Sequence, residues 1–190
     1  MNAPFVTQAA EGLPRRRFTN ADVDRMVDAG ILEPDEPMEL IKGEIVPMPS
    51  EHDLHGRARS LLIRAFNRAL GDEWFVATEL SLFLADDIEF KPDLHVFDAQ
   101  MKSHDVRGPD VRLAVELAAS SHRRDFDLKT PLYAEAGVRE LWVLDLDRRI
   151  AVVFTQPSSA GYSERVEHRA DAVLTPKAFP DISVRLADLF

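Results

Sequence analysis

Residues 113–118 read LAVELA, a run in which one glutamate interrupts otherwise apolar positions. The run predicts a buried strand, and alternation places Leu113 and Leu117 on one face and Glu116 on the other. An ionised carboxylate inside a sheet is costly unless a positive charge compensates it. The stretch therefore predicts a sheet and, next to it, a cation.

A second carboxylate precedes this strand in the chain. Residues 90–97, FKPDLHVF, predict a strand in which the proline is tolerable because it lies near the start. Alternation puts Asp93 and His95 on one face and the apolar side chains between them on the other. We therefore expect Asp93, like Glu116, to need a positive partner.

That partner can come from a helix expected from about Ser121 onward. Lys129 lies one helical turn after Asp125, so its ammonium could reach the two acids from a neighbouring element. Two carboxylates and a lysine are the minimum set for metal-assisted hydrolysis of a phosphodiester. The acids hold the metal, which polarises the phosphoryl oxygen and acidifies a water, and the lysine positions that water or offsets developing charge. Asp93, Glu116 and Lys129 are the candidate catalytic residues.

Each of these groups also has a structural interpretation. Glu116 and Lys129 could form a buried ion pair. Asp93 could form a turn after the proline. We expect Asp125 to cap the helix or to pair with Lys129 rather than to touch a metal.

Pro131 leaves two possibilities for the helix that carries Lys129. The helix could kink there, because proline lacks a backbone donor and crowds the carbonyl four residues earlier. Alternatively, a new helix could start with Thr130 as cap and Pro131 in its first position. The reach of Lys129 depends on which of the two forms.

A second helix is predicted over residues 51–70, with Gly71 at its end. Arg57, Arg64 and Arg68 share one face of it. That face is most simply exposed to solvent, and it is also the best candidate for contacts to backbone phosphates outside the site.

His52 and His55 lie one turn apart near the start of this helix. Histidines at this spacing can bind a metal, but we favour ordinary polar roles, because no third ligand lies near them in the sequence. Before the helix, residues 38–46 predict a tight hairpin with Gly43 in the positive-φ position.

The 190 residues suffice for one domain, which we place at 18–190 after a flexible lead over 1–17. The absence of cysteine excludes disulfides, thiolate metal sites and cysteine nucleophiles. We see no secretory signal and no membrane-spanning run, so we expect a cytoplasmic protein without a membrane partner. The net charge of −10 weakens any expectation of tight nucleic-acid binding, because partners of polyanions are usually basic.

An ordered set of short motifs resembles the Uma2 family, within the PD-(D/E)XK nuclease superfamily. The set comprises Glu39 to Ile45 (ELIKGEI), His55, Pro92-Asp93, Val115-Glu116-Leu117, Asp125 with Lys129, Tyr133, Gly137-Val138, Glu140 to Asp145 (ELWVLD) and the ending from Phe179 to Phe190. No single motif is specific, whereas their order is. The resemblance covers nearly everything after Phe18.

The resemblance implies an α/β, restriction-endonuclease-like fold: a mixed β-sheet flanked by helices, in agreement with strands and helices that do not alternate strictly. It also implies a Mg²⁺ cofactor, with Mn²⁺ as substitute, held by Asp93, Glu116 and the backbone carbonyl of Leu117. Lys129 would be the catalytic lysine, and Glu39 could add a further acid.

Two positions depart from the usual patterns. The superfamily's lysine lies two residues after the glutamate, where this chain has Ala118, so the lysine must come from the next helix. The family commonly shows serine and proline where this chain has Ala119 and Ser120. His55, which falls where the family carries a histidine, and Arg57 are the candidate substrate contacts.

We therefore expect a magnesium-dependent endonuclease acting on DNA, as a homodimer, since two sites most simply cut both strands. One alternative is a non-catalytic binding or assembly module on the same fold, which the net charge favours. Another is a hydrolase of a different phosphorylated substrate.

Overall fold

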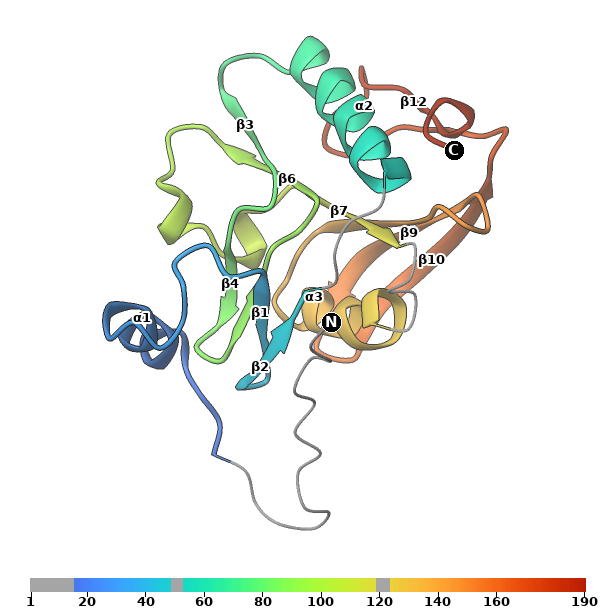
Figure 1. Cartoon of the computed structure of the whole chain (residues 1–190). Coiled ribbons are helices and arrows are strands. Elements are labelled where there is room, and N and C mark those ends of the chain that lie inside the picture. Colours follow the sequence, from blue (N-terminus) through green and yellow to red (C-terminus); the bar gives the residue numbers. More distant parts are fainter. Residues whose placement is uncertain (1–15, 49–52, 119–123) are drawn as a thin grey trace.

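The computed structural model describes residues 16–48, 53–118 and 124–190 (Figure 1). The helices are α1 (Asn20–Asp28), α2 (Asp53–Ala69), a π-helical turn (Arg124–Lys129) and α3 (Thr130–Glu135), with 3-10 turns at Ser103–Asp105, Gly108–Asp110 and Leu186–Asp188. The strands are β1 (Met38–Ile41), β2 (Glu44–Pro47), β3 (Trp74–Ala77), β4 (Leu82–Ala85), β5 (Ile88–Phe90), β6 (Leu94–Asp98), β7 (Leu113–Ala118), β8 (Glu140–Asp145), β9 (Ile150–Ser158), β10 (Gly161–Arg169), β11 (Val173–Leu174) and β12 (Val184–Arg185).

The strands form a six-stranded sheet in the order β10-β9-β8-β7-β6-β3, a four-stranded sheet in the order β2-β1-β5-β4, and the pair β11-β12. In the six-stranded sheet β7 and β8 run parallel, and the other neighbours run antiparallel. The sheet is therefore mixed, and helices flank it, which confirms the predicted fold class.

The core lies on both faces of the six-stranded sheet. On one face Leu62 and Phe66 of α2 pack with Val115 and Trp142. On the other face Tyr133 of α3 packs with a second group of buried side chains, including Phe90 of the four-stranded sheet. Figure 1 shows α2 and α3 on opposite sides of the central strands.

The strand predicted over residues 90–97 is in fact two strands in two different sheets. β5 ends at Phe90 and β6 begins at Leu94, with Lys91-Pro92-Asp93 carrying the chain from one sheet to the other. Pro92 has no N–H to give to a ladder, so the chain leaves one sheet and joins the next at this point. Asp93 consequently lies just before its strand.

The described part of the helix that carries Lys129 begins with a π-helical turn, which ends just before Thr130 and Pro131. The α-helix starts at Thr130 with Pro131 in its first turn, as a restarted helix would, but Thr130 is its first residue rather than its cap, and the π-helical turn leads directly into it. Lys129 is itself helical (φ −76°, ψ −40°), and Thr130 Oγ1 donates to the carbonyl oxygen of Asp125 over 2.8 Å. The wider turn gives the proline ring the room that an α-turn would deny it. The predicted start at Ser121 lies outside the described residues.

The hairpin turn at Lys42 and Gly43 and the strand β10 differ in how well the sequence predicts them. Lys42 and Gly43 both have positive φ (51° and 79°), which confirms the tight hairpin and adds the lysine to the positive-φ positions. By contrast, β10 is a nine-residue strand that no pattern described above predicts. Most of its side chains are exposed on both faces, so the apolar alternation that reveals a strand is missing.

Part of the predicted lead is fixed to the domain. Arg17 donates from Nε to the carbonyl oxygen of Lys42 (2.9 Å) and pairs with Asp87. Residues 1–15 of that lead lie outside the described residues. None of the described helices is both long and apolar enough to cross a membrane.

Candidate functional site

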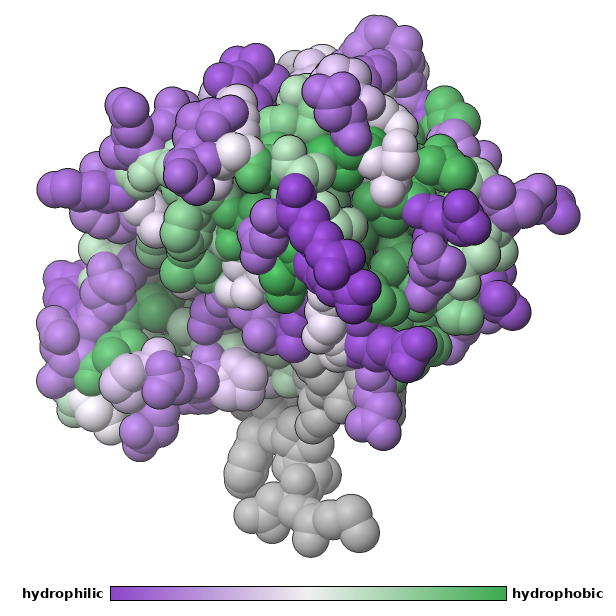
Figure 2. Space-filling model, turned by 90° about the horizontal axis from the view of Figure 1, so that it is seen from above, coloured by the Kyte–Doolittle hydropathy of each residue, from purple (hydrophilic) through white to green (hydrophobic). Residues whose placement is uncertain are grey.

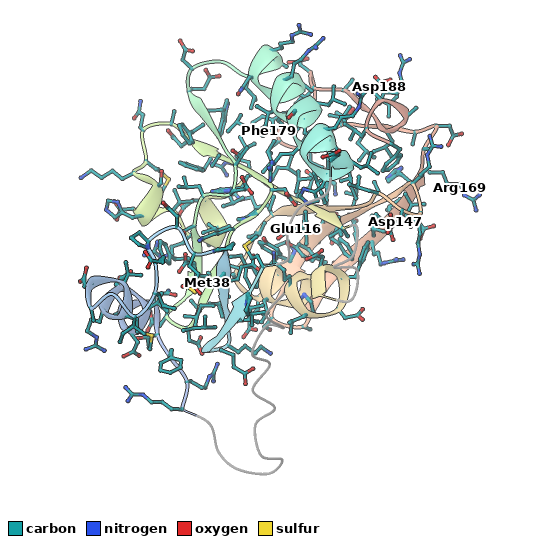
Figure 3. All side chains as sticks on the ribbon, in the orientation of Figure 1. Met38, Glu116, Asp147, Arg169, Phe179 and Asp188 are labelled. Atoms are coloured by element: carbon teal, nitrogen blue, oxygen red, sulfur yellow. The ribbon has the colours of Figure 1, made fainter. Side chains whose placement is uncertain are left out.

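Lys129 is the centre of the site. Only 2% of its surface is exposed, and its Nζ lies 2.6 Å from Glu116 Oε1 and 2.8 Å from Glu39 Oε1. Nζ also lies 4.9 Å from the centre of the Phe90 ring, a cation–π contact. One ammonium therefore joins β7 of the six-stranded sheet to β1 of the four-stranded sheet, and Figure 3 shows Glu116 in the interior at this junction.

Tyr133 adds a second hydrogen-bond donor to the same oxygen. Its hydroxyl donates to Glu116 Oε1 over 2.5 Å, and its ring packs edge-on against Phe90 at 5.1 Å. Burial and the neighbouring Glu116 carboxylate raise the pKa of Tyr133 well above its usual range, so the hydroxyl keeps its proton. The sequence marked Tyr133 as part of the motif set that resembles the family, but not as a hydrogen-bond donor to Glu116. The one available signal was that a buried tyrosine hydroxyl needs a partner.

Asp93 faces the same end of the sheet. Its Oδ2 accepts the backbone N–H of Leu117 (2.7 Å), and its Oδ1 lies 3.2 Å from His55 Nε2. Leu94 pairs with Val115 across the strands, which places Asp93 beside Glu116. The predicted residues Asp93, Glu116, Lys129 and His55 are thus brought together.

Arg59 is a site residue that sequence reasoning missed. Its Nη1 lies 3.6 Å from Asp93 Oδ1 and 2.8 Å from Glu79 Oε1. It follows His55 by one turn of α2, so the i, i+4 spacing was the available signal. Sequence reasoning chose Arg57 instead, which is exposed on α2. His52 lies outside the described residues.

Two buried glutamates of this cluster share one ammonium. The pKa of Glu116 is raised to about 8, chiefly by burial; Lys129 opposes the rise, and the charges of Asp125, Asp93 and Glu39 contribute to it. Burial alone would favour a neutral Lys129, but Glu116 and Glu39 outweigh it and raise the pKa of that amine. Lys129 is therefore shared by Glu116 and Glu39, while His55 and Arg59 lie beside Asp93.

The donor set fits a hard divalent cation. Glu39 Oε2 is buried and has no hydrogen-bond partner within the described part of the chain. Carboxylate oxygens are the ligands that Mg²⁺ prefers, and a cation beside Glu39 Oε2 would add to the one ammonium that the two glutamates share. Among the described residues, no group of three His, Asp or Glu side chains is placed to hold a metal ion. Glu39 and Glu116 instead contact Lys129, and Asp93 contacts Leu117 and His55.

Next to this cluster, α2 exposes a row of arginines. Arg57, Arg64 and Arg68 are exposed and form no ion pair with any described residue. Arg64 and Arg68 line a cavity of about 180 Å³ between α2 and the C-terminal segment, together with Arg185 of β12. Figure 2, seen from the side that carries α2, shows hydrophilic side chains over this face with hydrophobic surface between them.

The comparisons with known proteins agree with this fold. The model of the Uma2 family, described as "Putative restriction endonuclease", matches residues 22–187. The structure is similar to the crystal structure of a protein from Anabaena variabilis ATCC 29413, described as "a putative nuclease belonging to DUF820". The TM-score is 0.68 and the identity 18%, over 87% of this chain and 96% of that chain. No curated protein matches the sequence. Because the family match spans most of the chain and includes Glu39, Asp93, Glu116 and Lys129, the chain belongs to the Uma2 family.

Proposed function

We propose that the protein is a magnesium-dependent endonuclease that hydrolyses DNA phosphodiester bonds at the cluster around Lys129. The observation that carries the proposal is that Glu116 and Glu39, both buried, share one ammonium, and that Glu39 Oε2 has no hydrogen-bond partner among the described residues. A fold does not keep two buried acids on one ammonium for stability, because incompletely compensated buried charge costs free energy. Acids kept at this cost indicate a site that a cation completes.

Asp93, Glu116 and Glu39 are the residues that would hold the metal, with the backbone carbonyl of Leu117 as a further ligand. A bound Mg²⁺ supplies Lewis acidity and a water of lowered pKa. Mn²⁺ serves as a substitute. Lys129 keeps its positive charge beside Glu116, where it can stabilise charge that develops on the phosphate. Tyr133 fixes the orientation of Glu116 through its hydrogen bond.

The substrate side of the site lies at the start of α2. His55 and Arg59 reach Asp93 there, and Arg57 is exposed nearby. Arg64 and Arg68 extend a row of free positive charge along the helix, and phosphate oxygens are the usual partners of such arginines. The net charge of −10 then repels nucleic acid from other faces and leaves this face as its place of approach.

The direct test is cleavage of labelled duplex DNA with Mg²⁺ or Mn²⁺. We expect the wild-type protein to cut, and EDTA or Glu116→Ala to abolish cutting. Glu140→Gln, purified in the same way, is the matched control, because Glu140 is a buried glutamate on the next strand. Equal cleavage by the wild-type and Glu116→Ala proteins would show that the activity does not come from this cluster.

The acidic net charge favours one competing function, a non-catalytic binding or assembly module. Calorimetric titration with Mn²⁺ separates the two, because a binding module need not take up metal. A hydrolase of another phosphorylated substrate would bind Mn²⁺ as the nuclease does. Single-stranded DNA, RNA and a phosphomonoester, tested beside duplex DNA, distinguish that case.

A further inference from the structure

The strand β10 ends the six-stranded sheet with a long free edge. It has nine residues, whereas β3 at the other edge has four. Within the described ranges, β9 is the strand with which β10 pairs. A long edge of unpaired backbone groups is a template for another strand.

The sequence of β10 is self-complementary about Val166. Residues that face each other in antiparallel strands lie on the same side of the sheet. A two-fold axis through the edge must therefore be centred on a residue rather than between two residues. With the axis at Val166, Arg165 of each copy lies opposite Glu167 of the other, and Glu164 lies opposite His168.

Other central registers bring like charges together. Centring the axis on Glu164, Arg165 or Glu167 would place that charged side chain directly against its own copy, which is unfavourable. Charged side chains on an edge normally prevent unselective pairing. Here the same charges prevent the neighbouring registers and favour one.

The centre of that register is also apolar. Val166 is 52% exposed and lies opposite Val153 of β9, which packs against the core. Pairing at this register would set the two Val166 side chains side by side, each next to a Val153. Apolar surface exposed in one chain would be covered in the pair.

We propose that the protein is a homodimer in which β10 pairs antiparallel with β10 of a second copy about a two-fold axis at Val166. The two six-stranded sheets then become one continuous sheet. This interface does not depend on the proposed nuclease activity, because β10 contributes none of the residues of the cluster around Lys129.

The mass in solution tests the charge pattern. In size-exclusion chromatography with light scattering at micromolar concentration, we expect the wild-type chain to have twice the 21.4 kDa mass of one copy. Arg165→Glu sets two glutamates against each other at two symmetric places and should weaken dimerisation by about tenfold or more. Arg165→Glu with Glu167→Arg restores opposite charges and should restore the dimer.

Arg169→Glu is the matched control. It makes the same charge change on the same face of β10, and Figure 3 shows Arg169 at the outer rim of the molecule. In the proposed register Arg169 lies opposite Ser163, so the dimer should persist. A monomeric wild-type chain, equal effects of the two reversals, or failure of the double variant to restore the dimer would overturn the proposal.

A single cysteine tests the register itself, because the chain has none of its own. Val166→Cys brings two thiols opposite each other, with Cα atoms about 4.5–5.5 Å apart, within reach of a disulfide. Mild oxidation should therefore crosslink this variant into a covalent dimer. Val173→Cys, equally exposed at 53%, should stay uncrosslinked. No crosslink at position 166, or equal crosslinking at position 173, would overturn the register.

Discussion

Glu116 and Glu140 lie on neighbouring parallel strands, and both are buried, yet their surroundings differ in kind. Glu140 accepts the indole N–H of Trp142 at Oε1 (2.7 Å) and the backbone N–H of Lys177 at Oε2 (2.7 Å). Both of its oxygens have a donor. Glu116 shares a single ammonium with Glu39, and further acids surround it.

The comparison teaches that a buried carboxylate does not by itself mark a functional site. Burial raises the pKa of Glu140 as it does that of Glu116. What distinguishes the site is that two buried glutamates share one ammonium, and that one of their oxygens has no donor within the described part of the chain. The Glu140 region serves stability, and under the proposed function the Glu116 region gives up stability for a cation site.

The largest difference in stability is expected when Lys129 of the Glu116 region and Lys177 of the Glu140 region are each replaced. Lys129→Met leaves buried acids uncompensated and should lower the free energy of unfolding by about 3–5 kcal/mol, with loss of cleavage. Lys177→Met should cause a much smaller loss, because the bond to Glu140 comes from the backbone of Lys177. Urea unfolding in EDTA measures both variants. Similar losses would show that the two regions are alike.

Next come the two glutamates. Loss of a residue that supports a metal ligand typically costs about 10–100-fold in activity. Glu116→Gln removes a proposed ligand itself and should reduce cleavage by more than that, while the free energy of unfolding stays equal or rises. Glu140→Gln should keep cleavage and lose about 1–3 kcal/mol, because an amide cannot accept both hydrogen bonds as the carboxylate does. Cleavage assays and urea unfolding of both variants measure this crossed pattern. If Glu116→Gln were the less stable variant, the comparison would be wrong.

The pH dependence of stability follows from Glu116. Its pKa is raised from 4.5 to about 8, so the folded state keeps a proton that the unfolded state releases above pH 4.5. Its contribution to stability is fully present below pH 4.5 and is lost as the pH rises to about 8. Urea midpoints in EDTA across this range should fall with pH, and less steeply for Glu116→Gln. The same slope in both proteins would contradict the assignment.

The smallest effect separates two tyrosines. Tyr133→Phe should cost about 1 kcal/mol of stability and reduce kcat by about tenfold, because the orientation of Glu116 is no longer fixed. Tyr162→Phe removes a hydrogen bond to the carbonyl oxygen of Val138 and should cost a similar about 1 kcal/mol without a change in kcat. Urea denaturation and initial-rate measurements of both variants test these two expectations. An equal effect on kcat would remove Tyr133 from the site.

The sequence was sufficient for the parts of the fold that rest on local patterns. LAVELA predicted β7 and the direction of Glu116, and the turn at Lys42 and Gly43 predicted the hairpin. The polar strand β10 escaped because exposure on both faces removes the alternation on which strand prediction depends. The break at Pro92 was missed because a strand that changes sheets looks like one run in sequence.

The site was predictable as a set of residues but not as a set of contacts. Asp93, Glu116 and Lys129 were chosen as acids and amine near predicted strands, and the structure brings them together. Arg59 and the Tyr133 hydroxyl escaped because their partners lie far away in sequence. The position of Lys129 between two sheets depends on the π-helical turn, for which sequence offered only the ambiguity at Pro131.

The most direct test of the cation site is an anomalous-difference map from a crystal soaked in Mn²⁺. The account predicts a peak bound to the carboxylate of Glu116, and no peak in the Glu140 region. A map without a peak at Glu116 under saturating Mn²⁺ would contradict the claim that the acids around Lys129 bind a metal.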